Sequence, residues 1–206
     1  LLLISQAFFA LVTMWALWIL MCASATTAMG LSFSNTLTDH VVLQNPDTLW
    51  GLGARGESVE TRLISLPHCR KPGCRLGLAT VGPDGIWRQR ITLPETLAPL
   101  TITATSSNGT SISLNDVLIG KKFLCSGQSN IDAVTVQKAF NATAEIAACA
   151  AFPFIRIART QHLNAWDGPR TDVPSLSQTW AAPNAANCAG YSATCWFAAR
   201  EFFEKL

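Results

Sequence analysis

The stretch LCSGQSN at residues 124–130 holds a serine in a setting that suits nucleophilic chemistry. A serine hydroxyl becomes a nucleophile when a base takes its proton and fixed N–H groups stabilise the oxyanion. A tight turn between the end of a strand and a helix supplies such a geometry, and Ser129 is expected in such a turn. The residues alone leave two interpretations open, a catalytic Ser129 or a serine that caps the following helix. Cys125 is expected mid-strand, as a buried or disulfide-bonded residue rather than a nucleophile.

A second motif, GLGARG at residues 51–56, matches the dinucleotide-binding pattern G-x-G-x-x-G. That motif works only where a helix begins in the loop and holds the pyrophosphate at its N-terminus. Here ESVETRLI follows, which alternates and is rich in β-branched residues. We therefore predict a β-turn between two strands and no nucleotide cofactor.

The cysteines indicate disulfide chemistry. Beyond Cys22, the candidates are Cys69, Cys74, Cys125, Cys149, Cys188 and Cys195. Their even number favours disulfides in an exported chain, although sequence does not determine the pairing. A Cys69–Cys74 bridge is favoured because Pro72-Gly73 supplies a turn between them. Only His68 lies near a cysteine pair, so no zinc or other metal site is expected.

Residues 31–115 consist of short alternating segments separated by turn residues, and Asn108-Gly109 marks a hairpin. This pattern predicts an antiparallel β-sandwich or jelly-roll-like module. Residues 116–206 follow a different pattern of strands and helices. The expected elements are a buried strand at 117–127, a helix at 134–151, strands at 154–159 and 178–180, and a helix at 191–206 with one apolar face. Alternating strands and helices predict an α/β fold with a parallel sheet.

The first 28 residues indicate export. Residues 8–23 are uninterrupted apolar sequence, and Ala23 and Ala25 form a cleavage-like site, so a signal peptide is predicted, with a membrane anchor as the alternative. We expect the secretory pathway, with an extracellular or lysosomal destination. Asn108 and Asn141 begin sequons and are candidate glycosylation sites. The chain begins with Leu1 without a basic flank, so we expect its true N-terminus to lie upstream.

The charge balance excludes one class of partner. The 206 residues carry a formal net charge of +2, and only 14% of them are charged. No run of basic residues is present, so nucleic acid is not an expected partner. The apolar fraction of 49% is that of a packed globular chain.

Several segments together resemble one enzyme family. They are VVLQ at 41–44, LWGLGARGESV at 49–59, GIWRQRITLP at 85–94, NDVLIG at 115–120, LCSGQSN at 124–130, FNAT at 140–143, FIRI at 154–157, QTW at 178–180 and CWFAAREFFEKL at 195–206. In content and order they resemble the N-terminal part of the sialate O-acetylesterases, a branch of the SGNH (GDSL-like) serine esterases. The resemblance implies a β-module at 31–115, followed by the start of a three-layer, flavodoxin-like SGNH domain at 116–206.

The resemblance also implies roles for single residues. Ser129 corresponds to the nucleophile, and its own N–H would contribute to the oxyanion hole. Gly127, Gln128 and Asn130 would shape the loop, while Ile131 stands where the family usually has Met. The implied substrate is an acetylated sugar or a sialoglycoconjugate, without metal or cofactor.

The main difference from the family's pattern is that this sequence lacks the residues that supply the catalytic base. The family's glycine-bearing oxyanion block and its Asp-x-x-His block do not occur in this sequence, and His40, His68 and His162 match no catalytic position. A serine without a base is nearly inert at neutral pH. Two hypotheses follow: the N-terminal part of a secreted carbohydrate esterase, or an inactive secreted protein that binds glycans or has a structural role. The first is favoured because an incomplete sheet would leave the apolar face of 191–206 exposed.

Overall fold

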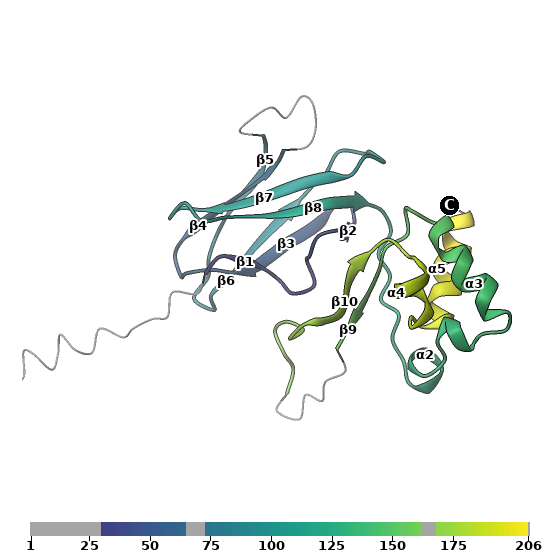
Figure 1. Ribbon diagram of the computed structural model, residues 1–206. Helices are drawn as coiled ribbons and strands as arrows, with labels where there is room; N and C mark the ends of the chain where they lie inside the picture. Colours follow the sequence, from purple (N-terminus) through teal and green to yellow (C-terminus); the bar gives the residue numbers. More distant parts are fainter. Residues whose placement is uncertain (1–29, 65–72, 162–167, 206) are drawn as a thin grey trace, which may run out of the picture.

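The computed structural model describes residues 30–64, 73–161 and 168–205. The protein is a mixed α/β molecule in which an all-β half precedes a half with helices and one small sheet (Figure 1). The predicted signal segment, His68, Cys69 and His162 lie outside the described residues. Within the described part of the chain, no helix has the length and apolar character needed to cross a membrane.

The all-β half contains two sheets. The smaller has the order β1-β3-β6 and the larger the order β2-β8-β7-β4-β5. The strands are β1 (Ser32–Phe33), β2 (Val42–Leu43), β3 (Asp47–Leu52), β4 (Ser58–Leu63), β5 (Cys74–Thr80), β6 (Ile86–Ile91), β7 (Leu100–Ser106) and β8 (Ser111–Ile119). Neighbouring strands pair antiparallel, except that β2 pairs parallel with β8.

Alternation along the strands produces the core of this half. Every second residue of β4 and β7 is buried, as expected for strands with one covered face. Leu49 and Trp87 of the smaller sheet share a hydrophobic cluster with Ile102 of the larger. The Trp87 indole N–H donates to the carbonyls of Ser32 and Leu52, both at 3.2 Å, so its polar edge is also satisfied.

Two local predictions in this half are confirmed. The chain turns between β7 and β8 at Asn108-Gly109, where Gly109 has a φ of +91° that favours glycine. The GLGARG segment connects β3, which ends at Leu52, to β4, which begins at Ser58. No helix begins at that connection, as the alternating residues after it predicted.

The second half surrounds a separate hydrophobic cluster built around Val136, Ile157 and Trp196. Its strands β9 (Ile157–Thr160) and β10 (Leu176–Ala181) form a two-stranded sheet. Its helices are α2 (Ser129–Asp132), α3 (Ala142–Ala148), α4 (Ala185–Ala189) and α5 (Ala193–Lys205), with 3-10 turns at Val136–Lys138 and Cys149–Ala151.

Three predictions for this half are wrong in detail. The strand expected at 117–127 ends at Ile119, where the chain leaves the five-stranded sheet, so Leu124 is 92% exposed and Cys125 does not lie mid-strand as expected. Of the helix expected at 134–151, only Ala142–Ala148 is α-helical, because the chain is extended at Ala139 and Asn141 adopts a left-handed φ of 57°. The two strands pair antiparallel, not parallel.

The helix at the end of the chain and the strand around QTW are confirmed as α5 and β10. Within that helix, Glu201 and Lys205 form an ion pair one turn apart. The predicted domain boundary at 115–116 falls inside β8, which spans it without a break. The division into two domains therefore stays a prediction.

Candidate active site around Ser129

Ser129 is the first residue of helix α2 and lies exposed with its neighbours Gly127, Gln128 and Asn130. The Gln128 carbonyl accepts hydrogen bonds from the amides of Ile131 and Asp132, at 2.8 and 3.0 Å. These two bonds close the turn. A residue at the start of a helix has no intrahelical acceptor for its own N–H, so the Ser129 amide is available to a ligand at the same place as its hydroxyl.

The turn is attached to the rest of this half at three points. A disulfide joins Cys125 to Cys195 in α5. The Thr194 hydroxyl, also in α5, donates to the Asn130 carbonyl at 3.2 Å. On the other side, Arg159 of β9 donates to the Asp132 carboxylate at 2.6 Å. The short helix that carries Ser129 is thus held between β9 and the start of α5.

Gly127 approaches the next turn of the chain closely. A Cβ atom added at Gly127 would lie 2.7 Å from Cγ1 of Ile131, which is shorter than a van der Waals contact. Ile131 is the residue that stands where the esterase family usually has Met. The position of the Ile131 side chain therefore requires a residue without a Cβ atom at 127.

No hydrogen bond to the Ser129 hydroxyl comes from the part of the chain that the structure describes. A histidine–carboxylate pair does occur elsewhere: His40 Nδ1 lies 2.7 Å from Asp116 Oδ2, which also accepts from Arg156 at 3.0 Å. Burial raises the pKa of Asp116, but the hydrogen bonds from His40 and Arg156 outweigh it and hold this pKa below its usual value.

This histidine is not placed as a base for Ser129. His40 precedes β2 and Asp116 lies in β8, whereas α2 lies well apart from both strands (Figure 1). His40 and Asp116 instead connect the all-β half to Arg156, just before β9. Among the described residues, no group of three or more His, Cys, Asp or Glu side chains is arranged to hold a metal ion.

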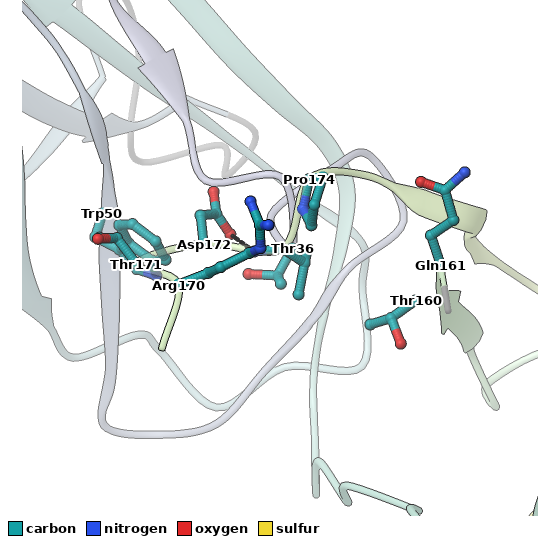
Figure 2. Close-up of a pocket in the computed structure, with 9 residues that line it drawn as sticks. Thr36, Trp50, Thr160, Gln161, Arg170, Thr171, Asp172 and Pro174 are labelled. Atoms are coloured by element: carbon teal, nitrogen blue, oxygen red, sulfur yellow. Dashed lines mark hydrogen bonds between the residues drawn. The ribbon is translucent and has the colours of Figure 1, made fainter. Parts of the chain in front are cut away.

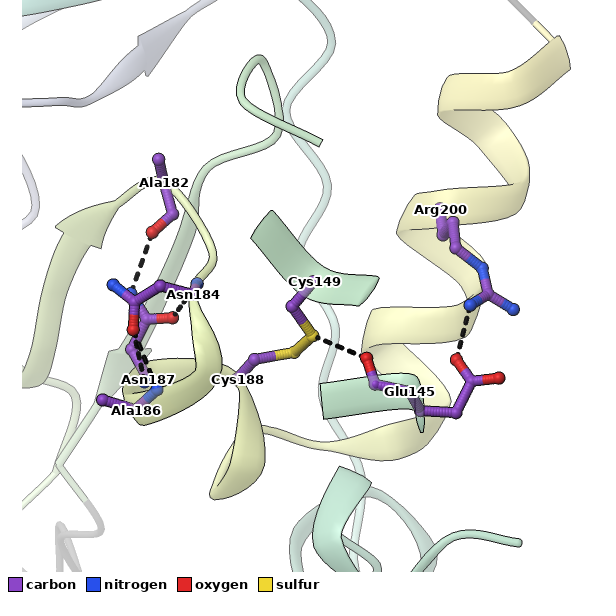
Figure 3. Close-up of a disulfide and its surroundings, with 8 residues drawn as sticks. All are labelled: Glu145, Cys149, Ala182, Asn184, Ala186, Asn187, Cys188 and Arg200. Atoms are coloured by element: carbon purple, nitrogen blue, oxygen red, sulfur yellow. Dashed lines mark hydrogen bonds and ion pairs between the residues drawn. A yellow bond between two sulfur atoms is a disulfide. The ribbon is translucent and has the colours of Figure 1, made fainter. Parts of the chain in front are cut away.

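Most of the cysteines that were expected to form disulfides do so. Besides Cys125–Cys195, a second bridge joins Cys149 to Cys188 in α4 (Figure 3). Cys74 is also disulfide-bonded, while Cys69, its expected partner, lies outside the described residues. Near the second bridge, Arg200 of α5 forms an ion pair with Glu145 of α3 at 2.5 Å.

Of the residues that hold the turn, the sequence indicated Cys125 and Cys195 as disulfide candidates but neither Arg159 nor Thr194. Arg159 and Thr194 belong to no recognisable motif and lie far along the chain from Ser129. Only their three-dimensional contacts with Asp132 and Asn130 reveal that they support it. Asn108 and Asn141, the candidate glycosylation sites, are both exposed, and their modification stays a prediction.

No family model matches the chain. Curated proteins do match it along most of its length. It is 26% identical to the mouse sialate O-acetylesterase over 194 residues, which is 89% of this chain and 35% of that protein. The human sialate O-acetylesterase is also 26% identical, over 91% of this chain and 37% of the relative.

The chain is a distant relative of the sialate O-acetylesterases. The relationship agrees with the resemblance of the collinear segments. The chain spans about a third of the length of these curated sialate O-acetylesterases.

Proposed function

We propose that Ser129 is the nucleophile of a secreted carbohydrate esterase of SGNH type, which removes O-acetyl groups from sialic acid or another acetylated sugar. The observation that carries this proposal is the relationship to sialate O-acetylesterases along about 90% of the chain. The exposed turn at Ser129 agrees with it, because a nucleophile must meet its substrate from solvent. In this proposal residues 31–115 are a β-module and residues 116–206 begin the esterase domain.

The proposed reaction is acyl transfer in two steps. The Ser129 oxygen attacks the acetyl carbonyl while a base takes the hydroxyl proton, and the resulting oxyanion accepts a hydrogen bond from the Ser129 amide. Collapse breaks the bond to the sugar oxygen, which leaves with the proton. Water then hydrolyses the acetyl-serine, releasing acetate and restoring the hydroxyl.

In this proposal the base does not come from the described residues, among which His40 lies apart from Ser129. A histidine with a carboxylate partner, as the family resemblance implies, would be supplied by further sequence of the same protein. The contributions of this chain are the nucleophile, one oxyanion donor and a turn held in place by Cys125, Thr194 and Arg159. Disulfides of this kind persist in oxidising compartments, which supports a secretory destination.

The test uses protein expressed from the full coding transcript that contains these 206 residues. Ser129→Ala is compared with Ser126→Ala, since Ser126 is an exposed serine three residues away in the same loop. Release of acetate from O-acetylated N-acetylneuraminic acid and from acetylated xylan is measured. We expect Ser129→Ala to reduce kcat by about 10³-fold or more and Ser126→Ala to leave it near the wild-type value.

Either of two results would overturn the proposal. One is acetate release that survives in Ser129→Ala. The other is a full transcript that encodes no histidine able to act as a base, together with no acetate release from the wild-type protein.

A further inference from the structure

Two adjoining hollows meet at Trp50, on the outer side of the smaller sheet. The larger has a volume of about 370 Å³ and the smaller about 190 Å³, and Trp50 and Thr171 line both. Arg170 lines the larger hollow and Arg88 the smaller. Figure 2 shows Thr171 at the Trp50 ring, while the Arg170 side chain extends from there towards Asp172 and Thr36. This surface is formed mainly by β3, β6, the end of β9 and the loop before β10, and not by the turn that carries Ser129.

The loop at 170–174, which forms one wall of the larger hollow, is hydrogen-bonded to the residues that follow β1. The Ser34 hydroxyl and the Asn35 amide donate to the Asp172 carboxylate, at 3.0 and 2.8 Å. The Asn35 side chain donates to the Val173 carbonyl at 2.8 Å. Because these bonds join residues about 137 positions apart, the wall is built into the fold rather than supplied by a loose loop.

The strand register places a cation beside the indole. Trp50 of β3 lies directly opposite Arg88 of β6, so both side chains stand on the same face of the sheet. Arg88 also pairs with the exposed Asp84 at 3.1 Å, which holds it near the strand. Thr48, two residues before Trp50, lies on the same face and lines the smaller hollow.

An indole face with guanidinium and hydroxyl groups around it has the chemistry that recognises a sugar. A pyranose ring presents a face of C–H groups that packs on an aromatic ring, while its hydroxyls exchange hydrogen bonds with polar groups at the edge. Guanidinium donates and cannot accept, and threonine does both. We propose that Trp50, Arg88, Arg170 and Thr171 form a carbohydrate-binding site with room for a glycan across the two hollows.

This site is independent of the chemistry proposed for Ser129. It would hold a glycan whether or not the protein hydrolyses an ester, and its test measures binding without any reaction. The two hypotheses can therefore fail separately.

The experiment is ligand-observed saturation-transfer NMR on the purified protein. The probes are N-acetylneuraminic acid, N-acetyllactosamine and xylobiose. Trp50→Leu removes the aromatic face but keeps apolar contact with the core, and Thr171→Arg fills both hollows from an exposed loop position. Thr179→Arg is the matched control, because Thr179 is an exposed threonine of β10 that lines neither hollow.

We expect saturation transfer to the ring protons of at least one probe with the wild type and with Thr179→Arg. Binding should weaken by about tenfold or more in Trp50→Leu and in Thr171→Arg. If Trp50→Leu does not fold, the binding measured with Thr171→Arg alone tests the proposed site. Absence of transfer from the wild type to all three sugars, or unchanged binding by Thr171→Arg, would overturn the proposal.

Discussion

In the turn at Ser129, a side chain at Gly127 would collide with Ile131. We expect Gly127→Ala to lower the free energy of unfolding by about 1 kcal/mol, because its methyl group would displace the isoleucine. In an Ile131→Ala background the same change should instead stabilise by about 0.5 kcal/mol, since alanine restricts the unfolded chain. Urea denaturation of the four proteins measures both values. Equal effects in both backgrounds would show that the two residues do not interact.

A second single residue, Asp116, should make the free energy of unfolding depend on pH. Its folded pKa lies below the usual value despite the opposing effect of burial, because His40 and Arg156 donate to it. The carboxylate therefore stabilises the fold above its unfolded pKa of about 3.9, and this stabilisation is lost as the pH falls through the lower folded value.

The variant that tests this is Asp116→Asn, which suits the left-handed φ of 51° at this position. With the side chain 34% exposed, solvent screening limits the expected loss to about 0.5–1 kcal/mol near pH 6. The loss should shrink towards zero near pH 3. Glu95→Gln, at an exposed carboxylate, serves as the control. A difference that persists unchanged at low pH would contradict the assignment.

At the scale of elements, the two disulfides hold different parts of the second half. Cys125–Cys195 closes 70 residues of chain and Cys149–Cys188 closes 39. Chain-entropy estimates give each about 4 kcal/mol, so stability alone does not distinguish them. We expect Cys125→Ala/Cys195→Ala to accelerate amide exchange at 126–133, and Cys149→Ala/Cys188→Ala to leave those amides protected. Equal acceleration in both variants would show that the first bridge does not specifically hold the turn.

The elements also show which features sequence can predict. Alternation in β4 and β7 identified strands because one face of each is buried in a common core. The run at 117–127 has the same apolar character, yet only its first residues are paired, since strand formation also requires a neighbouring edge. Similarly, the motif at Ser129 and its family resemblance predict a nucleophile there, whereas Arg159 and Thr194 act through contacts that no local pattern records.

At the scale of the whole molecule, large apolar side chains are exposed unevenly. In the second half these are Phe123, Leu124, Val134, Phe140, Phe154, Phe202 and Phe203. In the all-β half they are Ile64, Leu78 and Leu97. The first set includes an organised contact: the rings of Phe123 and Phe202 stack with centroids 5.0 Å apart, and Phe202 is still 48% exposed. The apolar face expected for the last helix is thus only partly covered, by the cluster around Trp196.

Such a surface should bind hydrophobic probes and promote association at high concentration. We expect Phe123→Ser/Phe202→Ser to remove about half of the ANS fluorescence of the native protein and to lower its association in sedimentation experiments. The loss of stability should be small, because both rings already contact water. Leu97→Ser is the control, since Leu97 is an isolated, 80% exposed side chain of the all-β half. If Leu97→Ser reduced ANS binding as strongly, the probe would be reporting scattered apolar residues and not the surface around α5.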